Sequence, residues 1–109
     1  MGTFYNPQDA GSYDLMTTQQ NKNLDFKSTA GVFSDSARVA YYVGNRLVKV
    51  STLDDDISII GNNVEDEEKT LRLVLNGPNF ASYRGGIIEA RCTLFTEGDV
   101  EVTFKLEIK

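Results

Sequence analysis

The chain has 109 residues, the size of a single domain, and such a domain buries roughly two thirds of its unfolded surface. Its 40% hydrophobic and 25% charged residues are ordinary for a globular protein, which argues against global disorder. The net charge of −5 argues against nucleic acid as a partner, because phosphate binding needs clustered Lys and Arg.

Composition also excludes several kinds of chemistry. The chain has no His, which removes Ser-His and Cys-His nucleophile pairs and the commonest zinc sites, although carboxylate dyads and Lys or Tyr acid-base chemistry remain possible. The single cysteine, Cys92, can form neither an intramolecular disulfide nor a cysteine metal site. We see no signal peptide and no apolar run near the ~20 residues of a membrane helix. We therefore expect a non-enzymatic protein of the cytoplasm, without cofactor, membrane or small-molecule substrate.

Residues 1–23 show neither strand nor helix periodicity, and they are rich in Asn, Gln, Gly and Thr. Three interpretations are open: a flexible tail, an ordinary first strand, or an extended arm whose large apolar residues order on a neighbouring subunit. We expect an arm over 1–23, followed by one domain over 24–109. Its candidate partner-binding residues are Phe4, Tyr5, Tyr13, Leu15 and Met16.

The segment "ARVAYYVGNRLVKVS" predicts a hairpin with a two-residue turn at Gly44-Asn45. A regular register would place Tyr41 opposite Val48 and Val39 opposite Val50, so these four side chains would form one apolar face. Tyr42 would then lie on the opposite face, either under a second sheet or on a contact surface.

The other predicted strands alternate apolar and polar residues. They are "LDFK", the short "ISII", "TLRLVL", "IIEARCTLF" and "VEVTFKLEIK". Pairing the apolar faces of the last two requires a loop with an odd number of residues, which we place at Thr96-Glu97-Gly98 with Gly98 in a left-handed conformation. Cys92 would then point into the core. Phe95 would point away from it and, like Tyr42, lie either under a second sheet or on a contact surface.

No segment shows a convincing helical period. About seven strands separated by turn signals predict an all-β fold, an antiparallel immunoglobulin-like β-sandwich without the disulfide of antibody domains.

The stretch "LDDDISIIGNNVEDEEK" holds seven acids within fifteen positions. Without these seven, the chain has nine acids and eleven bases, so the acidity is local. Starting at Asp54, its residue types partly fit a calcium loop, but Ile59 stands where that loop needs Gly. A strand at "ISII" would also separate the two groups of acids. Solvated loops are the expected interpretation, ahead of a weak calcium site or any catalytic role. The second group, Glu65, Asp66, Glu67 and Glu68, is a candidate protein-binding rim.

Tyr83-Arg84-Gly85-Gly86 resembles a phosphate-binding loop only in its glycines, since the motif spacing and the following helix are missing. We expect a structural turn, with Tyr83 as a corner tyrosine whose hydroxyl bonds to the preceding loop.

The C-terminal half, "LRLVLNGPNFASYRGGIIEARCTLFTEGDVEVTFKLEIK", resembles the immunoglobulin-like modules of tailed-phage virions, in particular the N-terminal domain of baseplate upper proteins. The shared features are a Leu-rich strand, a Tyr-x-Gly segment at Tyr83, an alternating strand, a hairpin centred on Gly98, and a final Thr103-Phe104 strand. That family's opening strand is not evident here. The resemblance implies a multimeric structural part of a virion, with no catalytic residues to carry over.

Two functions follow as hypotheses. The first is a structural or decoration subunit of a phage virion that assembles with itself or other virion subunits through its arm and one sheet face. The alternative is a stand-alone binding or inhibitor protein that presents Asp54–Glu68 to a basic surface on a host protein. A calcium- or carbohydrate-binding sandwich ranks third and an enzyme last.

Overall fold

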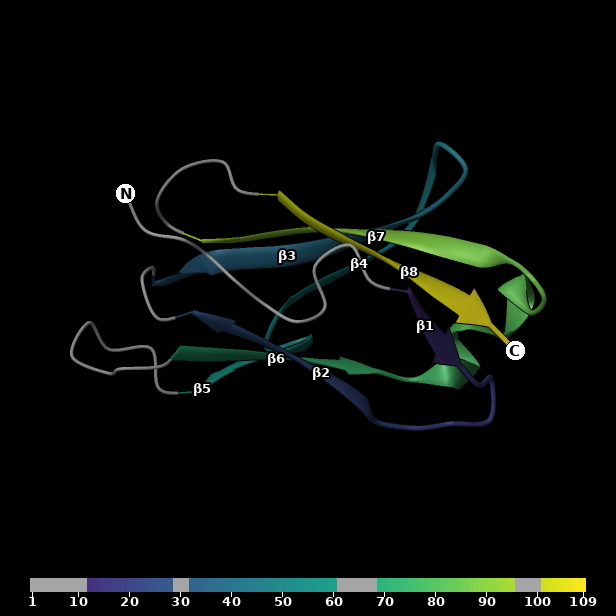
Figure 1. Ribbon diagram of the computed structural model, residues 1–109, viewed down its shortest axis with the longest axis horizontal. Coiled ribbons are helices and arrows are strands. Elements are labelled where there is room, and N and C mark those ends of the chain that lie inside the picture. The colour runs from purple at the N-terminus through teal and green to yellow at the C-terminus, as the bar shows by residue number, and fades with distance from the viewer. Residues whose placement is uncertain (1–11, 29–31, 61–68, 96–100) are drawn as a thin grey trace.

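The computed structural model describes residues 12–28, 32–60, 69–95 and 101–109, which form eight strands and one 3-10 helix (Figure 1). In chain order these elements are β1 (Ser12–Leu15), β2 (Lys22–Ser28), β3 (Phe33–Val43), β4 (Arg46–Leu53), β5 (Asp56–Ile60), β6 (Lys69–Leu75), η1 (Gly77–Tyr83), β7 (Ile87–Phe95) and β8 (Glu101–Ile108).

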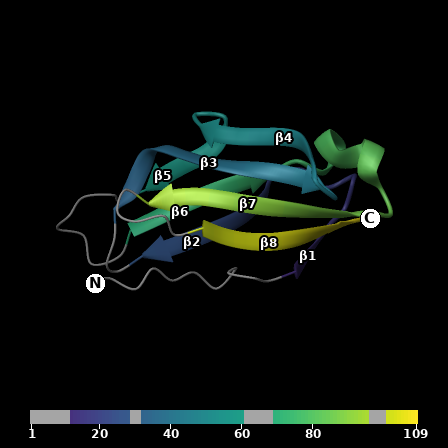
Figure 2. The same cartoon turned by 90° about the horizontal axis from the view of Figure 1, so that it is seen from above.

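The strands follow one hydrogen-bonded order, β1-β8-β7-β3-β4-β5-β6-β2. At the step from β4 to β5 the sheet folds over, so that β5, β6 and β2 lie beneath β4, β3, β7 and β8 (Figures 1 and 2). The result is an all-β, sandwich-like fold, as expected. The expected purely antiparallel pairing is wrong at two places, because β1 runs parallel to β8 and β4 runs parallel to β5.

The core lies between the two layers and is built from alternating positions of the long strands. This core includes Leu71, Leu73 and Leu75 of β6 and Phe104 and Leu106 of β8, which are all at most 1% exposed. The predicted alternation is therefore confirmed for β6 and β8. On β7 the inward row also holds Cys92, which is fully buried.

The pairing of β7 with β8 agrees with the predicted parity. Ile88 pairs with Leu106 and Cys92 with Val102, so the apolar faces of the two strands coincide. The loop expected at Thr96-Glu97-Gly98 lies outside the described residues.

The hairpin of β3 and β4 has the expected two-residue turn, with Gly44 at a φ of 62°. Its predicted register is wrong beyond the first two pairs. Tyr42 pairs with Leu47 but Tyr41 pairs with Lys49, so Val48 is an extra residue and forms a β-bulge. As a result Ser51, rather than Val50, lies on the core side opposite Val39.

Residues 12–23 are part of the sandwich and do not extend from it as an arm. β1 pairs with the end of β8, and Leu15 is fully buried. The chain end is held on the same strand, since the Lys109 amide donates to the Leu15 carbonyl at 2.9 Å and the Thr17 amide donates to the Lys109 carbonyl at 2.7 Å. The arm expectation therefore fails for this part, and residues 1–11 lie outside the described ranges.

The 3-10 helix η1 was not predicted, because no segment of the sequence shows a convincing helical period. It begins after Asn76, and Phe80 points from it into the core, with its ring centre 5.4 Å from that of Tyr41. Its first residue, Gly77, donates its amide to the Gln19 carbonyl at 2.7 Å. No helix among the described residues is long and apolar enough to cross a membrane.

Candidate functional site

The outer face of the layer β4-β3-β7-β8 is the broad surface seen in Figure 2. Strand register determines which side chains meet on it. Tyr42 is flanked by Leu47 of β4 and Glu89 of β7, and Ala40 is flanked by Val50 and Arg91 in the same way. Tyr42 thus lies on the face opposite the core, as the sequence indicated.

Tyr42 is half-buried because an arginine covers it. The guanidinium carbon of Arg91 lies 4.1 Å from the centre of the Tyr42 ring, a cation–π contact. Arg91 Nε donates to Glu89 Oε1 at 2.7 Å, so the charged group is oriented from two sides. The sequence analysis missed Arg91, although its two-residue spacing from Glu89 on a strand already placed both side chains on one face.

Exposed apolar side chains concentrate on this same face. Five large hydrophobic residues are classed as exposed in the described part of the chain, and three of them, Leu47, Val50 and Ile87, belong to it. Their exposed fractions are 52%, 37% and 56%. We call Tyr42, Leu47, Val50, Ile87 and Arg91 the outer-face patch.

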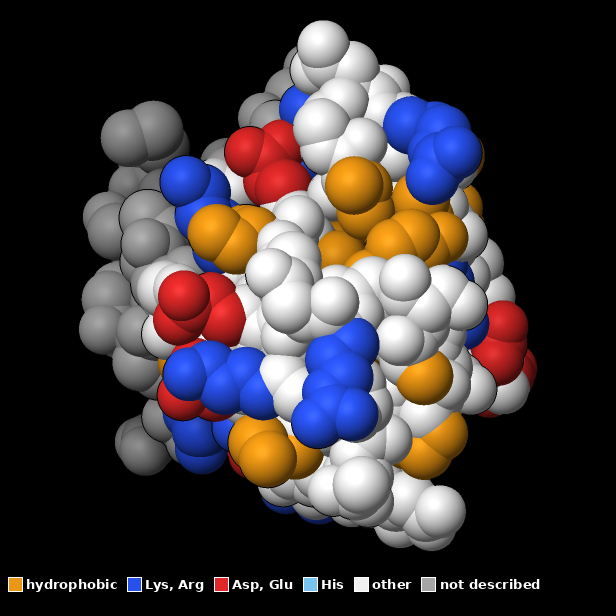
Figure 3. Space-filling model, turned by 90° about the vertical axis from the view of Figure 1, so that its right-hand side faces the viewer, with side chains coloured by type: hydrophobic (Ala, Val, Ile, Leu, Met, Phe, Trp, Pro, Cys, Tyr) orange, Lys and Arg blue, Asp and Glu red, His pale blue; other side chains and the backbone are white. Residues whose placement is uncertain are grey.

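The patch continues at one end into a shallow pocket of about 320 Å³. Its lining includes the apolar or aromatic residues Val43, Tyr83 and Ile87 and the basic residue Arg84. Figure 3 looks onto this end of the molecule and shows hydrophobic side chains gathered beside Lys and Arg. Gly85, at a φ of 88°, forms the expected left-handed turn before β7. Among the described residues, the Tyr83 hydroxyl makes no hydrogen bond to the preceding loop, so the corner role is not supported.

The other predicted arm residues divide into separate environments. Tyr13 packs edge-on against Phe104 of the core, with ring centres 5.9 Å apart. Leu15 belongs to the core, so it cannot contact a neighbouring subunit as we expected. Met16 is 47% exposed. Phe4 and Tyr5 lie outside the described residues, as does the side chain of Phe95, whose backbone pairs with Phe33.

The first half of the acidic stretch is a tight connection between β4 and β5. Thr52 and Asp55 exchange backbone hydrogen bonds of 3.0 and 2.9 Å, and Asp54 and Asp56 adopt φ angles of 69° and 79°. Positive φ is unusual outside Gly, but Asp tolerates it better than most residues. The chain turns here from one layer to the other.

Asp56 is bound to side chains of β4. Ser51 Oγ donates to Asp56 Oδ2 at 3.0 Å, and Lys49 Nζ lies 3.3 Å from the same oxygen. The Ser51 hydroxyl also lies 3.0 Å from the Tyr41 hydroxyl in the core. Burial raises the pKa of the Tyr41 phenol, against the opposing effect of the Ser51 hydrogen bond. This buried polar network was not evident from the sequence.

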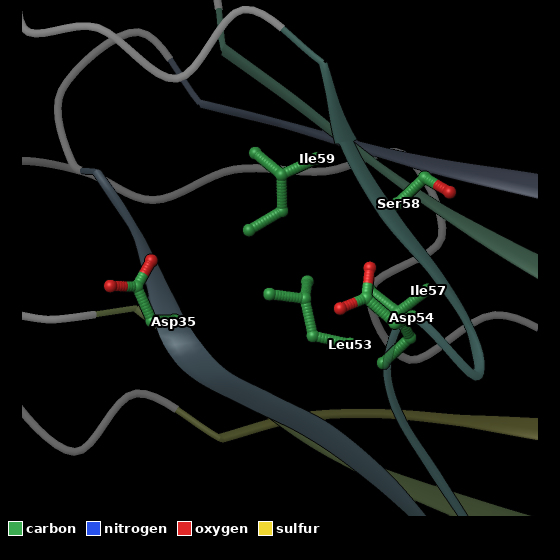
Figure 4. Close-up of a pocket in the computed structure, with 6 residues that line it drawn as sticks. All are labelled: Asp35, Leu53, Asp54, Ile57, Ser58 and Ile59. Atoms are coloured by element: carbon green, nitrogen blue, oxygen red, sulfur yellow. The ribbon is translucent and has the colours of Figure 1, made fainter.

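Ile57 is buried and Ile59 half-buried on β5, as the strand interpretation of "ISII" required. A pocket of about 390 Å³ opens beside them, with Asp35 and Asp54 at opposite sides and Leu53 and Ile59 between (Figure 4). No group of three or more metal-ligating side chains occurs in the ranges that the structure describes. The Glu65, Asp66, Glu67 and Glu68 rim lies outside those ranges.

A second charged contact supports the fold rather than a site. Arg72 of β6 donates from Nε and Nη2 to both carboxylate oxygens of Asp25 on β2, at 2.8 and 3.1 Å. This hydrogen bonding lowers the pKa of the Asp25 carboxyl and raises that of the Arg72 guanidinium.

Comparisons with known proteins add little beyond this description. No protein-family model matches the chain, and no curated protein matches it either. One similar solved structure is the CARDB domain of the PF1109 protein of Pyrococcus furiosus in complex with di-metal ions, at 16% identity and a TM-score of 0.43, covering 92% of this chain and 86% of that one. Another is the extracellular domains 3–5 of Drosophila OTK, at 9% identity and a TM-score of 0.32, covering 96% of this chain and 34% of that one. Neither likeness is strong enough to assign a family.

Proposed function

We propose that the chain is a non-enzymatic structural or decoration subunit of a larger particle, of the tailed-phage type that its C-terminal half resembles. In this proposal it assembles through the outer-face patch and the segment 1–11. The observation that carries the proposal is the concentration of exposed apolar side chains, three of five among the described residues, on one sheet face. Exposed apolar surface gathered on one face is a feature of protein interaction sites.

The proposed fold type is immunoglobulin-like. The support is the distribution of strands, with β2, β6 and β5 in one layer and β8, β7, β3 and β4 in the other. That is the arrangement of strands B, E and D against G, F, C and C′ in immunoglobulin domains. Such domains often serve as rigid interaction modules, which suits a subunit that works by contact.

The structure changes how the N-terminal part of this proposal has to be tested. A deletion of residues 1–20 would remove β1 and the buried Leu15, so any loss of assembly would be confounded by unfolding. A deletion of residues 1–11 leaves every described strand intact. We expect that variant to melt close to the full chain and to assemble less well.

The direct test is the copy number of the chain in purified phage particles, measured by quantitative mass spectrometry. We expect a fixed copy number for the wild type and a clear loss for Leu47→Lys, a change on the outer-face patch. Ile60→Lys is the matched control, because Ile60 is 49% exposed but lies on β5 in the other layer. A chain that is absent from particles would contradict the proposal.

The second candidate function remains a binding protein that presents acidic residues to a basic host surface. Its support is that Asp54 and Asp55 are exposed at the β4–β5 turn. Replacing Glu65, Asp66, Glu67 and Glu68 by their amides is then expected to abolish binding to the basic partner and its salt dependence. Binding that survives this change with the same salt dependence would exclude this candidate.

A further inference from the structure

The outer-face patch has a charge pattern that differs from that of the whole molecule. Among the side chains that the structure describes, the face carries three bases, Arg38, Arg91 and Lys105, and two acids, Glu89 and Glu107, whereas the chain as a whole has a net charge of −5. The backbone position of Glu101, opposite Thr93, belongs to the same face. The register fixes the arrangement, since Glu89 pairs with Lys105 across β7 and β8. The apolar side chains lie mainly over β3 and β4, and the charged ones lie mainly over β7 and β8.

This pattern limits what can cover the face. A polyanion would meet Glu89 and Glu107, and a strongly basic surface would meet Arg38, Arg91 and Lys105. The complementary surface needs an apolar stripe of its own, bordered by charges of both signs. A second copy of the same face meets that description, and its near-neutral charge keeps local repulsion at the contact low although each molecule carries a net negative charge.

The strand edges favour packing by faces over pairing by edges. β4 pairs with β5 only at Thr52 and Leu53, and the rest of the strand is made irregular by the Val48 bulge in its pairing with β3. β1 has only four residues, and β2 presents Lys22, Asp25 and Lys27 along its length. Short, bulged or charged edges are poor templates for an added strand.

The centre of the patch is already ordered before any partner binds. The Arg91 guanidinium is held over the Tyr42 ring at 4.1 Å and by Glu89 at 2.7 Å. Tyr and Arg are among the residues that contribute most to protein interfaces, and a side chain fixed in advance loses less conformational entropy on association.

We propose that this face is a homodimer interface, in which two copies pack their outer-face patches against each other about a two-fold axis. The inference rests on the proposed function and names the partner of the same surface. The outer-face patch, with Arg91 over Tyr42, lies at the centre of this interface, and Glu89, Lys105 and Glu107 lie at its rim. Two sheets packed face to face in this way align at roughly 30° to each other.

The experiment is sedimentation equilibrium of the full chain from low micromolar to millimolar concentration. We expect the average mass to rise from that of the 12.1 kDa monomer toward twice that value. Leu47→Lys and Ile87→Lys each place a charge at the centre of the interface without disturbing the core, and each is expected to weaken dimerisation at least tenfold. Ile60→Lys, the same change in chemistry on the other layer, is expected to leave it unchanged.

Three results would overturn the dimer. One is a monomer at every concentration, and a second is equal weakening by Leu47→Lys and Ile60→Lys. The third is open-ended growth beyond the dimer, which indicates a contact between two different surfaces. Melting temperatures of all variants show whether each is folded. A monomeric chain that is still incorporated into phage particles, with loss in Leu47→Lys, would refute the dimer and keep the proposed function.

Discussion

The hydroxyls of Tyr41 and Ser51 lie 3.0 Å apart inside the sandwich, where both residues are fully buried. Ser51 Oγ in turn donates to Asp56 at 3.0 Å. The phenol of Tyr41 therefore donates to Ser51, and the network runs from the core to the connection between the two layers.

Removal of the Tyr41 hydroxyl and removal of the Ser51 hydroxyl should lower the free energy of unfolding by different amounts. Tyr41→Phe leaves Ser51 bonded to Asp56, and we expect a loss of about 0.5–1.5 kcal/mol in the free energy of unfolding. Ser51→Ala leaves the Tyr41 hydroxyl buried without its acceptor, and we expect a larger loss of about 1–3 kcal/mol. Urea denaturation measures both, and the double variant should lose less than the two single losses combined. The reverse order of the single variants would refute this account of the network.

The same burial predicts a loss of stability in alkali. Because burial raises the pKa of the Tyr41 phenol above the usual 10.0, its stabilising contribution is complete below pH 10. It is lost as pH rises further, at up to about 1.4 kcal/mol per pH unit while the unfolded phenol ionises and the folded one does not. Denaturation midpoints between pH 9 and 11 measure this slope. Tyr41→Phe should reduce it, and an unchanged slope in that variant would assign the effect to other groups.

Gly77 is expected to tolerate no side chain. A Cβ at this position would overlap the Met16 carbonyl oxygen and lie 2.9 Å from that of Gln19, so backbone would have to move. We expect Gly77→Ala to destabilise the protein by several kcal/mol, of the order found for an overpacked core. Asn79→Ala, an exposed change two residues along η1, is the control and should stay within about 0.5 kcal/mol in thermal melting. Equal stability of the two variants would contradict the close approach.

A regular hairpin would place Val39 and Val50 opposite each other on the core face, whereas the bulge in β4 places them on different faces. Val39 is fully buried, whereas Val50 is 37% exposed on the outer face. We expect Val39→Ala to cost about 2 kcal/mol and Val50→Ala to cost well under 1 kcal/mol. Chemical denaturation of the two variants measures the difference, and similar losses would support the regular register instead.

These examples show which parts of the fold were predictable from sequence. Strict alternation predicted the inward rows of β6 and β8, and the parity of the β7–β8 pairing followed from those rows. In β4, alternation of Val48 and Val50 predicted the wrong register. There the bulge brings Ser51 and Lys49 to Asp56 across the turn into β5. The alternation within β4 carries no information about Asp56. The preference of Lys49 and Ser51 for the side of β4 that faces Asp56 therefore could not be predicted from it.

The N-terminal strand was missed for a related reason. β1 has four residues, too few to show a period, and it pairs in parallel with a strand near the other end of the chain. The apolar character of its residues was recognised, but the surface that they cover belongs to the same molecule. In the candidate site, the face of Tyr42 could be predicted, whereas the Arg91 contact depends on the neighbouring strand β7.

Leu15 and its neighbour Met16 test whether the N-terminal strand β1 belongs to the fold in solution. Leu15 is fully buried, and Met16, next to it, is 47% exposed. We expect Leu15→Ala to cost about 2–5 kcal/mol, because a cavity opens in the core beside β8. Met16→Ala should change the free energy of unfolding by less than about 0.5 kcal/mol. If urea denaturation shows Leu15→Ala to be as stable as Met16→Ala, β1 is not held on the sandwich in solution, and an arm that begins before β2 becomes the correct description.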